Sequence, residues 1–304
     1  MHRIGIDLGG TKIEGILMDA KGEIVETVRV STPDSYFGTV KTIHEMTVKL
    51  DEIVDNVCPV GLGTPGAWVP QSGTMKNCNS TVLNGKPFLH DLQRLLNRPI
   101  RIANDANCMA LSEAVDGAAA EAHCVFGVIL GTGVGGGCVV NQDVIAGPNL
   151  LAGEWGHNRF PSVPTDAGLV VNPNEKPRTC YCGETNCVET FLSGRGLETT
   201  HLELHGERMT APAIGRGETD QASRTVDEYI QQLAVALAVV VNIVDPDVIV
   251  IGGGLSNISR IYDKLPALLE KYAFSSEGAT EVVPAKYGDS SGRRGAAWLF
   301  PAVS

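Results

Sequence analysis

A buried strand that runs into a glycine-rich turn occurs three times in this chain of 304 residues. The pattern predicts strands at residues 3–8, 124–130 and 247–251, each ending in such a turn. After the first two turns a second strand follows at once, at 13–18 and 138–141. Two halves that begin in the same way indicate an internal duplication rather than a solenoid repeat.

Apolar residues at helical spacing follow these strands. They predict a helix over 37–56, an Ala-rich helix over 106–120, a helix over 188–197 and a long apolar helix over 222–244. Strands mixed with helices of this length predict an α/β fold.

The chain is long enough for two ordinary domains. The boundary is expected within the Ala-rich helix, and the last predicted helix is expected to pack back on the first half. We therefore predict a small first domain over 1–115, a larger second domain over 116–289, and a C-terminal helix within 290–304 that belongs to the first.

Composition argues against several classes of partner and location. A net charge of -11 and a pI near 5.1 disfavour nucleic acid and anionic membranes as partners. No apolar run approaches the roughly 20 residues that span a bilayer, and the N-terminus passes straight into a strand without a signal peptide. Eight cysteines without a secretory signal indicate a reducing compartment, so we expect a cytoplasmic protein.

Three of the cysteines form a C-x-C-x4-C run, and three thiols cannot all pair as disulfides. All three can reach one metal ion, and a histidine from a separate loop completes a set that structural Zn2+ uses: Cys180, Cys182, Cys187 and His157. The alternative is three unrelated thiols. Glu154 and Glu189 stand beside these residues, which indicates a scaffold for a polar ligand site.

The glycine-rich turns lie at 9–11, 131–137 and 252–254. A turn without Cβ atoms lets backbone N–H groups approach a phosphate closely. A single turn of this kind is as often a tight hairpin, but three after buried strands predict a nucleotide clamped between two halves. The order Thr11-Lys12 and the strand after it exclude a P-loop, and a Rossmann fingerprint is also missing.

Two acidic residues at strand ends, Asp7 and Asp105, each have two possible roles. Asp7 is the only acid in its strand, and a contact to Mg2+, direct or through water, would account for it. The alternative is an Asp that caps a turn. Asn104-Asp105 closes another strand, where Asp105 is either the N-cap of the following helix or a general base beside a substrate ligand.

Together these segments resemble the ROK family of sugar kinases and related repressors over essentially the whole chain. The matching segments are GIDLGGTK at 5–12, GLGTPG at 61–66, ANDANC at 103–108, GTGVGGG at 131–137, GEWGH at 153–157, CYCGETNCVE at 180–189 and DPDVIVIGGG at 245–254. The resemblance implies the actin-like, ribonuclease-H-like duplicated fold, with two domains that flank a central cleft.

The resemblance also implies roles for individual residues. Asp105 resembles the catalytic base that takes the proton from the sugar hydroxyl. Residues that resemble sugar ligands are Asn79, Asn104, Asp105, Glu154, His157 and Glu189. His157 is expected to bind zinc through one ring nitrogen and to face the sugar with the other. Residues that resemble contacts to ATP are Asp7 (near Mg2+), Gly9, Gly10, Thr11, Lys12, Gly131, Thr132, Gly133, Gly253 and Gly254.

Three segments bear on the substrate within the family. The stretches at 77–85, 153–158 and 288–301 most resemble bacterial fructokinases that also accept mannose. The resemblance therefore implies an ATP-dependent kinase for the 6-hydroxyl of fructose. The alternatives are an N-acetylglucosamine kinase or a glucokinase of the same family, and more remotely a non-catalytic sugar-binding protein. A repressor is disfavoured, because a first strand at residue 3 leaves no room for a helix-turn-helix domain.

The resemblance finally implies a homodimer built from the zinc-bearing domain. Trp155, Phe160 and Phe191 lie near the metal-binding segment in sequence, and residues 161–177 are rich in proline. These aromatic residues either form the interface or pack the metal-binding segment itself.

Overall fold

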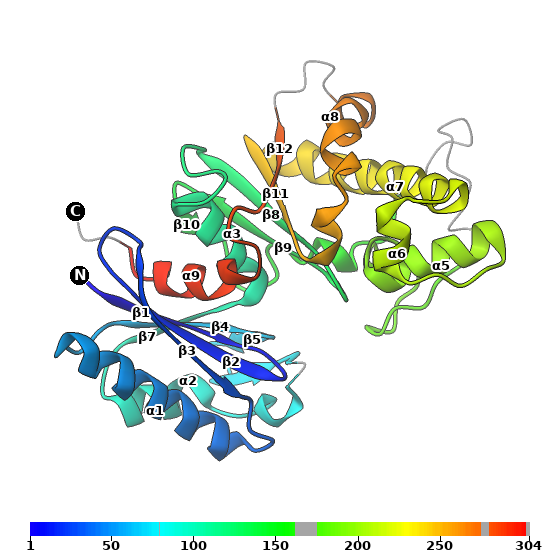
Figure 1. Cartoon of the computed structure of the whole chain (residues 1–304). Coiled ribbons are helices and arrows are strands. Elements are labelled where there is room, and N and C mark those ends of the chain that lie inside the picture. Colours follow the sequence, from blue (N-terminus) through cyan, green and yellow to red (C-terminus); the bar gives the residue numbers. More distant parts are fainter. Residues whose placement is uncertain (79, 162–174, 275–279, 302–304) are drawn as a thin grey trace. The chain divides into compact units, whose positions relative to one another are not determined.

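The structure is a computed structural model that describes residues 1–78, 80–161, 175–274 and 280–301 (Figure 1). Contacts divide the chain into two compact units. Unit 1 comprises Met1–Glu121, Gln142–Ala152 and Asp289–Ser304, and unit 2 comprises Ala122–Asn141 and Gly153–Gly288. The segment Gln142–Ala152 thus belongs to unit 1, whereas the sequence placed it in the second domain.

Unit 1 is built on a five-stranded sheet in the order β3-β2-β1-β4-β7. The strands are β1 (Arg3–Leu8), β2 (Lys12–Met18), β3 (Ile24–Ser31), β4 (Val60–Thr64) and β7 (Ile100–Asn104). The first three form an antiparallel meander, and β4 and β7 continue from β1 in parallel. The carboxyl ends of β1, β4 and β7 therefore meet at one edge, which carries Asp7 and Asn104.

Helices cover both faces of this sheet (Figure 1). One face carries α1 (Tyr36–Val54) and α2 (Phe88–Leu96), and the other carries α9 (Ser291–Trp298), which also packs on α3 (Asp105–Val115). Ser35 starts α1 by accepting a hydrogen bond from the N–H of Gly38, and a stripe of apolar residues buries the helix on the sheet. The helix predicted over 106–120 is α3, which ends five residues earlier than expected.

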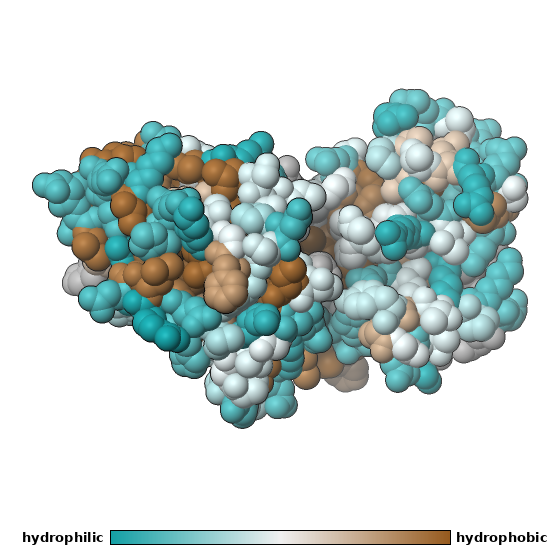
Figure 2. Space-filling view, turned by 90° about the horizontal axis from the view of Figure 1, so that it is seen from below, coloured by the Kyte–Doolittle hydropathy of each residue, from teal (hydrophilic) through white to brown (hydrophobic). Residues whose placement is uncertain are grey.

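The close approach of α9 depends on two glycines in the sheet. A Cβ on Gly5 or Gly61 would overlap the carbonyl oxygens of Arg293 and Ala296, respectively. Unit 1 also contains the hairpin β5 (Ala67–Val69) and β6 (Thr74–Lys76), followed by the short 3₁₀ helix η1 (Thr81–Leu83); η5 (Gly288–Ser290) precedes α9. Apolar side chains gather on the face formed by α1 and α2 (Figure 2), and those most exposed there are Phe37, Ile53 and Leu95.

Unit 2 repeats the strand–turn–strand arrangement on a second sheet, in which its own strands follow the order β9-β8-β11-β12. These strands are β8 (Cys124–Leu130), β9 (Val134–Val140), β11 (Val248–Gly252) and β12 (Glu281–Pro284), whereas β10 (Asp143–Val144) belongs to the segment Gln142–Ala152 of unit 1. β8 and β9 are antiparallel, as β1 and β2 are, and β11 and β12 run parallel to β8. The predicted α/β class and the predicted duplication are both present.

The helices of unit 2 are α4 (Glu189–Leu192), α5 (Gly194–His205), α6 (Ala211–Arg216), α7 (Asp220–Val244) and α8 (Arg260–Tyr272), with short 3₁₀ helices η2 (Trp155–His157) and η4 (Gly254–Asn257). The single helix predicted over 188–197 is wrong. Ser193 is extended and accepts a hydrogen bond from the N–H of Gly196, so α4 stops there and α5 starts.

Helix α7 is the core helix of unit 2. Tyr229, Leu233 and Leu237 on this helix are fully buried, and the Tyr229 hydroxyl donates to the carbonyl of Leu192. Among the described residues, α7 alone is long and apolar enough to cross a membrane, but 67% of its most apolar window is buried inside the protein. Such burial is the behaviour of a helix that fills a core.

Candidate functional site

The predicted site residues that the structure describes fall into two groups, one in each unit. Unit 1 holds Asp7, Gly9, Gly10, Thr11, Lys12, Asn104 and Asp105. Unit 2 holds Gly131, Thr132, Gly133, Glu154, His157, Cys180, Cys182, Cys187, Glu189, Gly253 and Gly254. Asn79, predicted to bind sugar, lies outside the described residues.

The end of β7 separates the roles of Asn104 and Asp105. Asn104 is the N-cap of α3, and its side-chain oxygen accepts a hydrogen bond of 2.7 Å from the N–H of Asn107. Asp105 is the first residue inside the helix, with Oδ1 2.8 Å from the N–H of Ala106. The capping role that the sequence left open for Asp105 therefore belongs to its neighbour.

Desolvation makes Asp105 a stronger base than an ordinary aspartate. Its side chain is accessible to solvent, yet enough protein surrounds the carboxylate that desolvation raises the pKa of Asp105 above its usual value. The backbone N–H of Ala106 opposes this shift. An accessible carboxylate with a raised pKa suits a general base that receives a proton from a bound hydroxyl.

Asp7 belongs to the same acidic group. Desolvation, and then the charges of Asp105 and Glu14, raise the pKa of Asp7 to about 6. The backbone comes close on one side, since a Cβ on Gly292 would lie 3.1 Å from Oδ2 of Asp7. Two desolvated carboxylates near one another favour a cation between or beside them, which fits the Mg2+ contact expected for Asp7.

Glu14 forms ion pairs with three basic side chains next to this acidic group. Its buried carboxylate contacts Lys12 Nζ at 2.7 Å, Arg29 Nη2 at 2.8 Å and Arg293 Nη1 at 2.8 Å. Burial would raise the pKa of Glu14, but hydrogen bonds and charges from Lys12, Arg293 and Arg29 outweigh it and lower the pKa. Lys12, expected to contact the nucleotide, is thus held by Glu14 in this structure.

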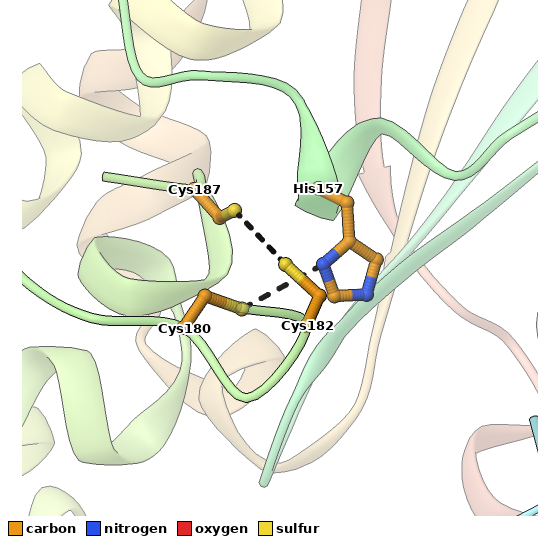
Figure 3. A group of neighbouring side chains, drawn as sticks. All are labelled: His157, Cys180, Cys182 and Cys187. Atoms are coloured by element: carbon orange, nitrogen blue, oxygen red, sulfur yellow. Dashed lines mark hydrogen bonds between the residues drawn. The ribbon is translucent and has the colours of Figure 1, made fainter. Parts of the chain in front are cut away.

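In unit 2, the predicted metal ligands converge. The ligand atoms of His157, Cys180, Cys182 and Cys187 all lie within 4.8 Å of one another (Figure 3). We call these four residues the Cys/His cluster. His157 comes from η2, and the cysteines come from a tight turn in which Gly183 and Asn186 have positive φ.

The spacing of the Cys/His cluster fits one zinc ion. A tetrahedral zinc with Zn–S bonds of about 2.3 Å places its ligand atoms about 3.5 to 3.8 Å apart. Cys182 Sγ lies 3.6 Å from Cys187 Sγ, and Cys180 Sγ lies 3.7 Å from His157 Nδ1. Without a cation, burial raises the pKa of Cys187 to about 12, so a bound metal ion would have to stabilise its thiolate.

The second ring nitrogen of His157 has a protein partner that the sequence did not predict. Nε2 lies 3.0 Å from the hydroxyl of Tyr181, and the two rings meet edge to face. If Nδ1 binds the metal, the neutral imidazole carries its proton on Nε2 and donates to the Tyr181 oxygen. The predicted sugar-facing nitrogen is therefore hydrogen-bonded to Tyr181, whose side chain is 81% exposed.

Glu189 lies between the Cys/His cluster and the turn that joins β8 to β9. Its Oε2 accepts a hydrogen bond of 3.0 Å from the N–H of Val134, and its Oε1 lies 3.9 Å from Cys180 Sγ. Glu154, the other predicted sugar-binding acid of unit 2, precedes η2 and is partly buried.

A cavity of about 710 Å3 opens within unit 2 beside the predicted nucleotide turns. Gly131, Thr132 and Gly254 line it, together with residues of α5, α6 and η4. Its size and mixed lining suit a small organic ligand such as a nucleotide. Gly253 has a φ of +83°, and a Cβ there would lie 2.5 Å from the carbonyl oxygen of Leu130, so this turn requires glycine.

The aromatic residues proposed for a dimer interface are buried. Trp155, Phe160 and Phe191 belong to the hydrophobic core of unit 2. They therefore fill the core of unit 2 and form no exposed surface. Most of the proline-rich stretch at 161–177 lies outside the described residues.

Sequence reasoning missed Glu14, Arg293 and Tyr181. Glu14 is the one acid within the apolar strand β2, a signal of the same kind as Asp7 in β1. Arg293 stands in the GRRGAA segment of α9, where only the fold shows which neighbour it meets. Tyr181 lies between two predicted metal ligands, which could have marked it as a neighbour of the site.

Comparisons with known proteins agree along the whole chain. The ROK family model matches residues 3–303. An N-acetyl-D-glucosamine kinase from Vibrio atlanticus is 40% identical over 300 residues, covering 97% of this chain and 98% of the relative. One from Vibrio cholerae is 40% identical over 299 residues, with 97% and 98% covered.

Solved structures show the same fold. A ROK hexokinase from Thermus thermophilus has a TM-score of 0.84 at 28% identity, covering 98% of this chain and 97% of that chain. A ROK family glucokinase from Streptomyces griseus, in complex with glucose and AMPPNP, has a TM-score of 0.73 at 26% identity, with 98% and 99% covered. The predicted actin-like, ribonuclease-H-like fold class is confirmed, and the chain belongs to the ROK family of sugar kinases and related repressors.

Proposed function

We propose that this protein is an N-acetylglucosamine kinase that transfers the γ-phosphoryl group of ATP to the 6-hydroxyl of the sugar. The observation that carries the choice of sugar is the set of relatives 38 to 40% identical over 97% of the chain, all named N-acetyl-D-glucosamine kinases. None of these relatives is named a fructokinase, the activity that the sequence favoured. The alternative, an N-acetylglucosamine kinase, is therefore better supported.

Asp105 is the proposed general base. In the transfer, the sugar oxygen bonds to the γ-phosphorus, the bond from that phosphorus to the bridging oxygen breaks, and ADP leaves. The hydroxyl proton passes to the Asp105 carboxylate, whose raised pKa and solvent access support this role. Asn104, Glu154, His157 and Glu189 are the proposed ligands of the sugar hydroxyls, with Asn79 outside the described residues.

The cavity lined by Gly131, Thr132 and Gly254 is the proposed nucleotide site. The turn at Gly9 and Gly10 and the neighbouring residues Thr11 and Lys12 are proposed to contact the phosphates. Asp7 would hold Mg2+, which neutralises phosphate charge when bound. The Cys/His cluster would hold one structural Zn2+, which supplies cross-linking of the two loops and no step of the reaction.

A cytoplasmic location and a homodimer complete the proposal. The homodimer follows from the family resemblance, and the location follows from the cysteines, whose free thiols suit a reducing compartment.

A coupled assay of ADP release over a panel of hexoses tests the function. We expect N-acetylglucosamine to give the highest kcat/KM, above fructose, mannose, glucose and N-acetylmannosamine. A higher value for fructose would restore the fructokinase assignment and overturn the choice of sugar. If none of these sugars stimulates ADP release, the assignment as a hexose kinase is overturned.

A further inference from the structure

We propose that Glu189 is a positioning residue that ties the Cys/His cluster to the β8–β9 turn (residues 131–133), so that metal binding and nucleotide binding strengthen each other. The inference rests on the proposed function, because it assumes that this turn receives nucleotide phosphates. It assigns to Glu189 a role toward the nucleotide, in addition to its proposed contact with the sugar.

The carboxylate of Glu189 closes the turn from one side. Oε2 accepts the N–H of Val134 at 3.0 Å, directly after the turn. A Cβ on Gly133 would lie 2.7 Å from the same oxygen, so the backbone of the turn lies tightly against the carboxylate. Glu189 is two residues beyond the ligand Cys187, and its Oε1 lies 3.9 Å from Cys180 Sγ.

The chain just beyond Glu189 holds the other end of the turn. The N–H of Gly194 donates to the carbonyl of Gly131 at 2.8 Å, and the N–H of Gly131 donates to the carbonyl of Gly133 at 3.0 Å. Helix α4 (Glu189–Leu192) thus links both attachments to the cysteine-bearing segment. Thr132, between these attachments, lines the cavity proposed for the nucleotide.

The histidine-bearing loop contacts the strand that follows the turn. Trp155 Nε1 donates to the carbonyl of Gly135 at 2.9 Å, and a Cβ on Gly156 would overlap the carbonyl of Val134. His157 follows directly in this loop. The cysteine-bearing segment and the loop that carries His157 therefore both pack against the β8–β9 turn or the start of β9. A metal ion that joins these two segments would hold the turn in place.

Preorganisation gives this arrangement a thermodynamic consequence. Backbone N–H groups bind phosphate best when the turn is already fixed, because ordering it on binding costs conformational entropy. If the metal fixes the turn through Glu189, the metal raises nucleotide affinity. Linkage then requires the nucleotide to raise metal affinity by the same factor.

The first experiment measures binding of magnesium AMPPNP by calorimetry without sugar, on zinc-loaded protein. We expect Glu189→Ala to weaken binding about tenfold, as expected for the loss of one charge-assisted hydrogen bond. Glu189→Gln should restore most of the affinity, because its amide oxygen can still accept from Val134. Glu184→Ala, an exposed acid on the same turn as the cysteines, is the matched control and should bind like the wild type.

The second experiment measures the reverse direction by following zinc release to a chromogenic chelator. Magnesium AMPPNP should slow release from the wild type and from Glu184→Ala, and this protection should shrink in Glu189→Ala. Equal nucleotide affinity and equal protection in the wild type and Glu189→Ala would overturn the inference. Absence of nucleotide binding to the wild type would instead overturn the proposed kinase function, so the two failures are distinguishable.

Discussion

Asp7 and Glu14 are cross-strand partners in the antiparallel pair β1–β2, and the pKa values of their carboxyl groups shift in opposite directions. Desolvation raises the pKa of Asp7 to about 6, whereas Glu14 keeps a lowered pKa because Lys12, Arg293 and Arg29 neutralise it despite its burial. Glu14 is a satisfied anion within the unit. Asp7 is an anion that the unit alone does not satisfy, which is expected of a ligand for a cation.

Asp7→Asn should stabilise the ligand-free protein at neutral pH. The folded state binds a proton on Asp7 with a pKa of about 6, above the unfolded value near 3.9, so the charged form costs free energy above that pH. We expect the variant to gain on the order of 1 to 2 kcal/mol in unfolding free energy at pH 7.5. The gain should shrink as the pH falls from about 6 to about 4, where the wild-type side chain becomes protonated in both states.

Urea unfolding at pH 7.5 and pH 4.5 measures this gain. Asp263→Asn, an exposed acid on α8, is the control and should leave stability unchanged at both pH values. The same Asp7→Asn variant should lose most kinase activity, because it removes the proposed Mg2+ contact. A gain that persists undiminished at pH 4.5 would contradict the electrostatic origin.

Asp105→Asn should leave the fold intact and lower kcat by about 10²-fold or more, as expected for the loss of a general base. Nucleotide affinity should not change. Asn104→Ala separates the two neighbours: it removes the cap of α3 and should cost about 1 kcal/mol of stability. Steady-state kinetics and thermal unfolding of both variants check the assignment, and a wild-type kcat in Asp105→Asn would rule out its role as base.

Cys182→Ser should lower zinc content, stability and activity together. The serine oxygen is a poor substitute for a thiolate in a structural zinc shell, and the loops that carry His157 and Glu189 would lose their cross-link. Metal analysis and thermal unfolding are the measurements. Thr185→Ser on the same turn is the control that should retain one zinc per chain, and unchanged metal content in Cys182→Ser would show that the ligand set is wrong.

The fold could be predicted from sequence wherever local pattern and tertiary packing agree. The run at β8 is continuous and apolar, the run at β1 is mostly buried, and both strands formed as expected. The helix over 188–197 failed because the cap at Ser193 competes with apolar spacing and wins. Strands β5, β6 and β12 have only three or four residues each, so long-range pairing rather than local pattern decides them.

The candidate site shows the same division. The Cys/His cluster could be predicted because metal ligands must be particular residue types, and the structure brings all four together. The partners of Glu14 could not be predicted, since Lys12, Arg29 and Arg293 come from three elements and only the folded chain brings them to one carboxylate. The contact of His157 with Tyr181 likewise depends on side-chain geometry that a sequence does not contain.

Gly295→Ala tests the packing of α9 on α3. A Cβ on Gly295 would overlap the carbonyl oxygen of Cys108, which is backbone and cannot rotate away. We expect a loss of about 3 kcal/mol or more, larger than the roughly 1 kcal/mol that alanine gains over glycine inside a helix. Gly254→Ala is the control, since the added methyl group meets no atom within 4 Å, and chemical unfolding should show it near wild type. Equal stability of both variants would mean that the helices pack less closely than described.

The proposed homodimer can be tested on the surface of unit 2. The buried positions of Trp155, Phe160 and Phe191 exclude them as an interface, so other apolar residues must form it. Phe274, two residues beyond the end of α8, is 97% exposed, more than any other large apolar residue among the described residues. Sedimentation at micromolar concentration should give a mass near twice 32.2 kDa.

Phe274→Asp should shift this species toward the monomer, because a desolvated charge at an interface is costly. Phe37→Asp on α1 of unit 1 is the matched control and should leave the dimer intact. A wild-type mass near one chain would refute the dimer, and dissociation by Phe37→Asp alone would move the interface to unit 1.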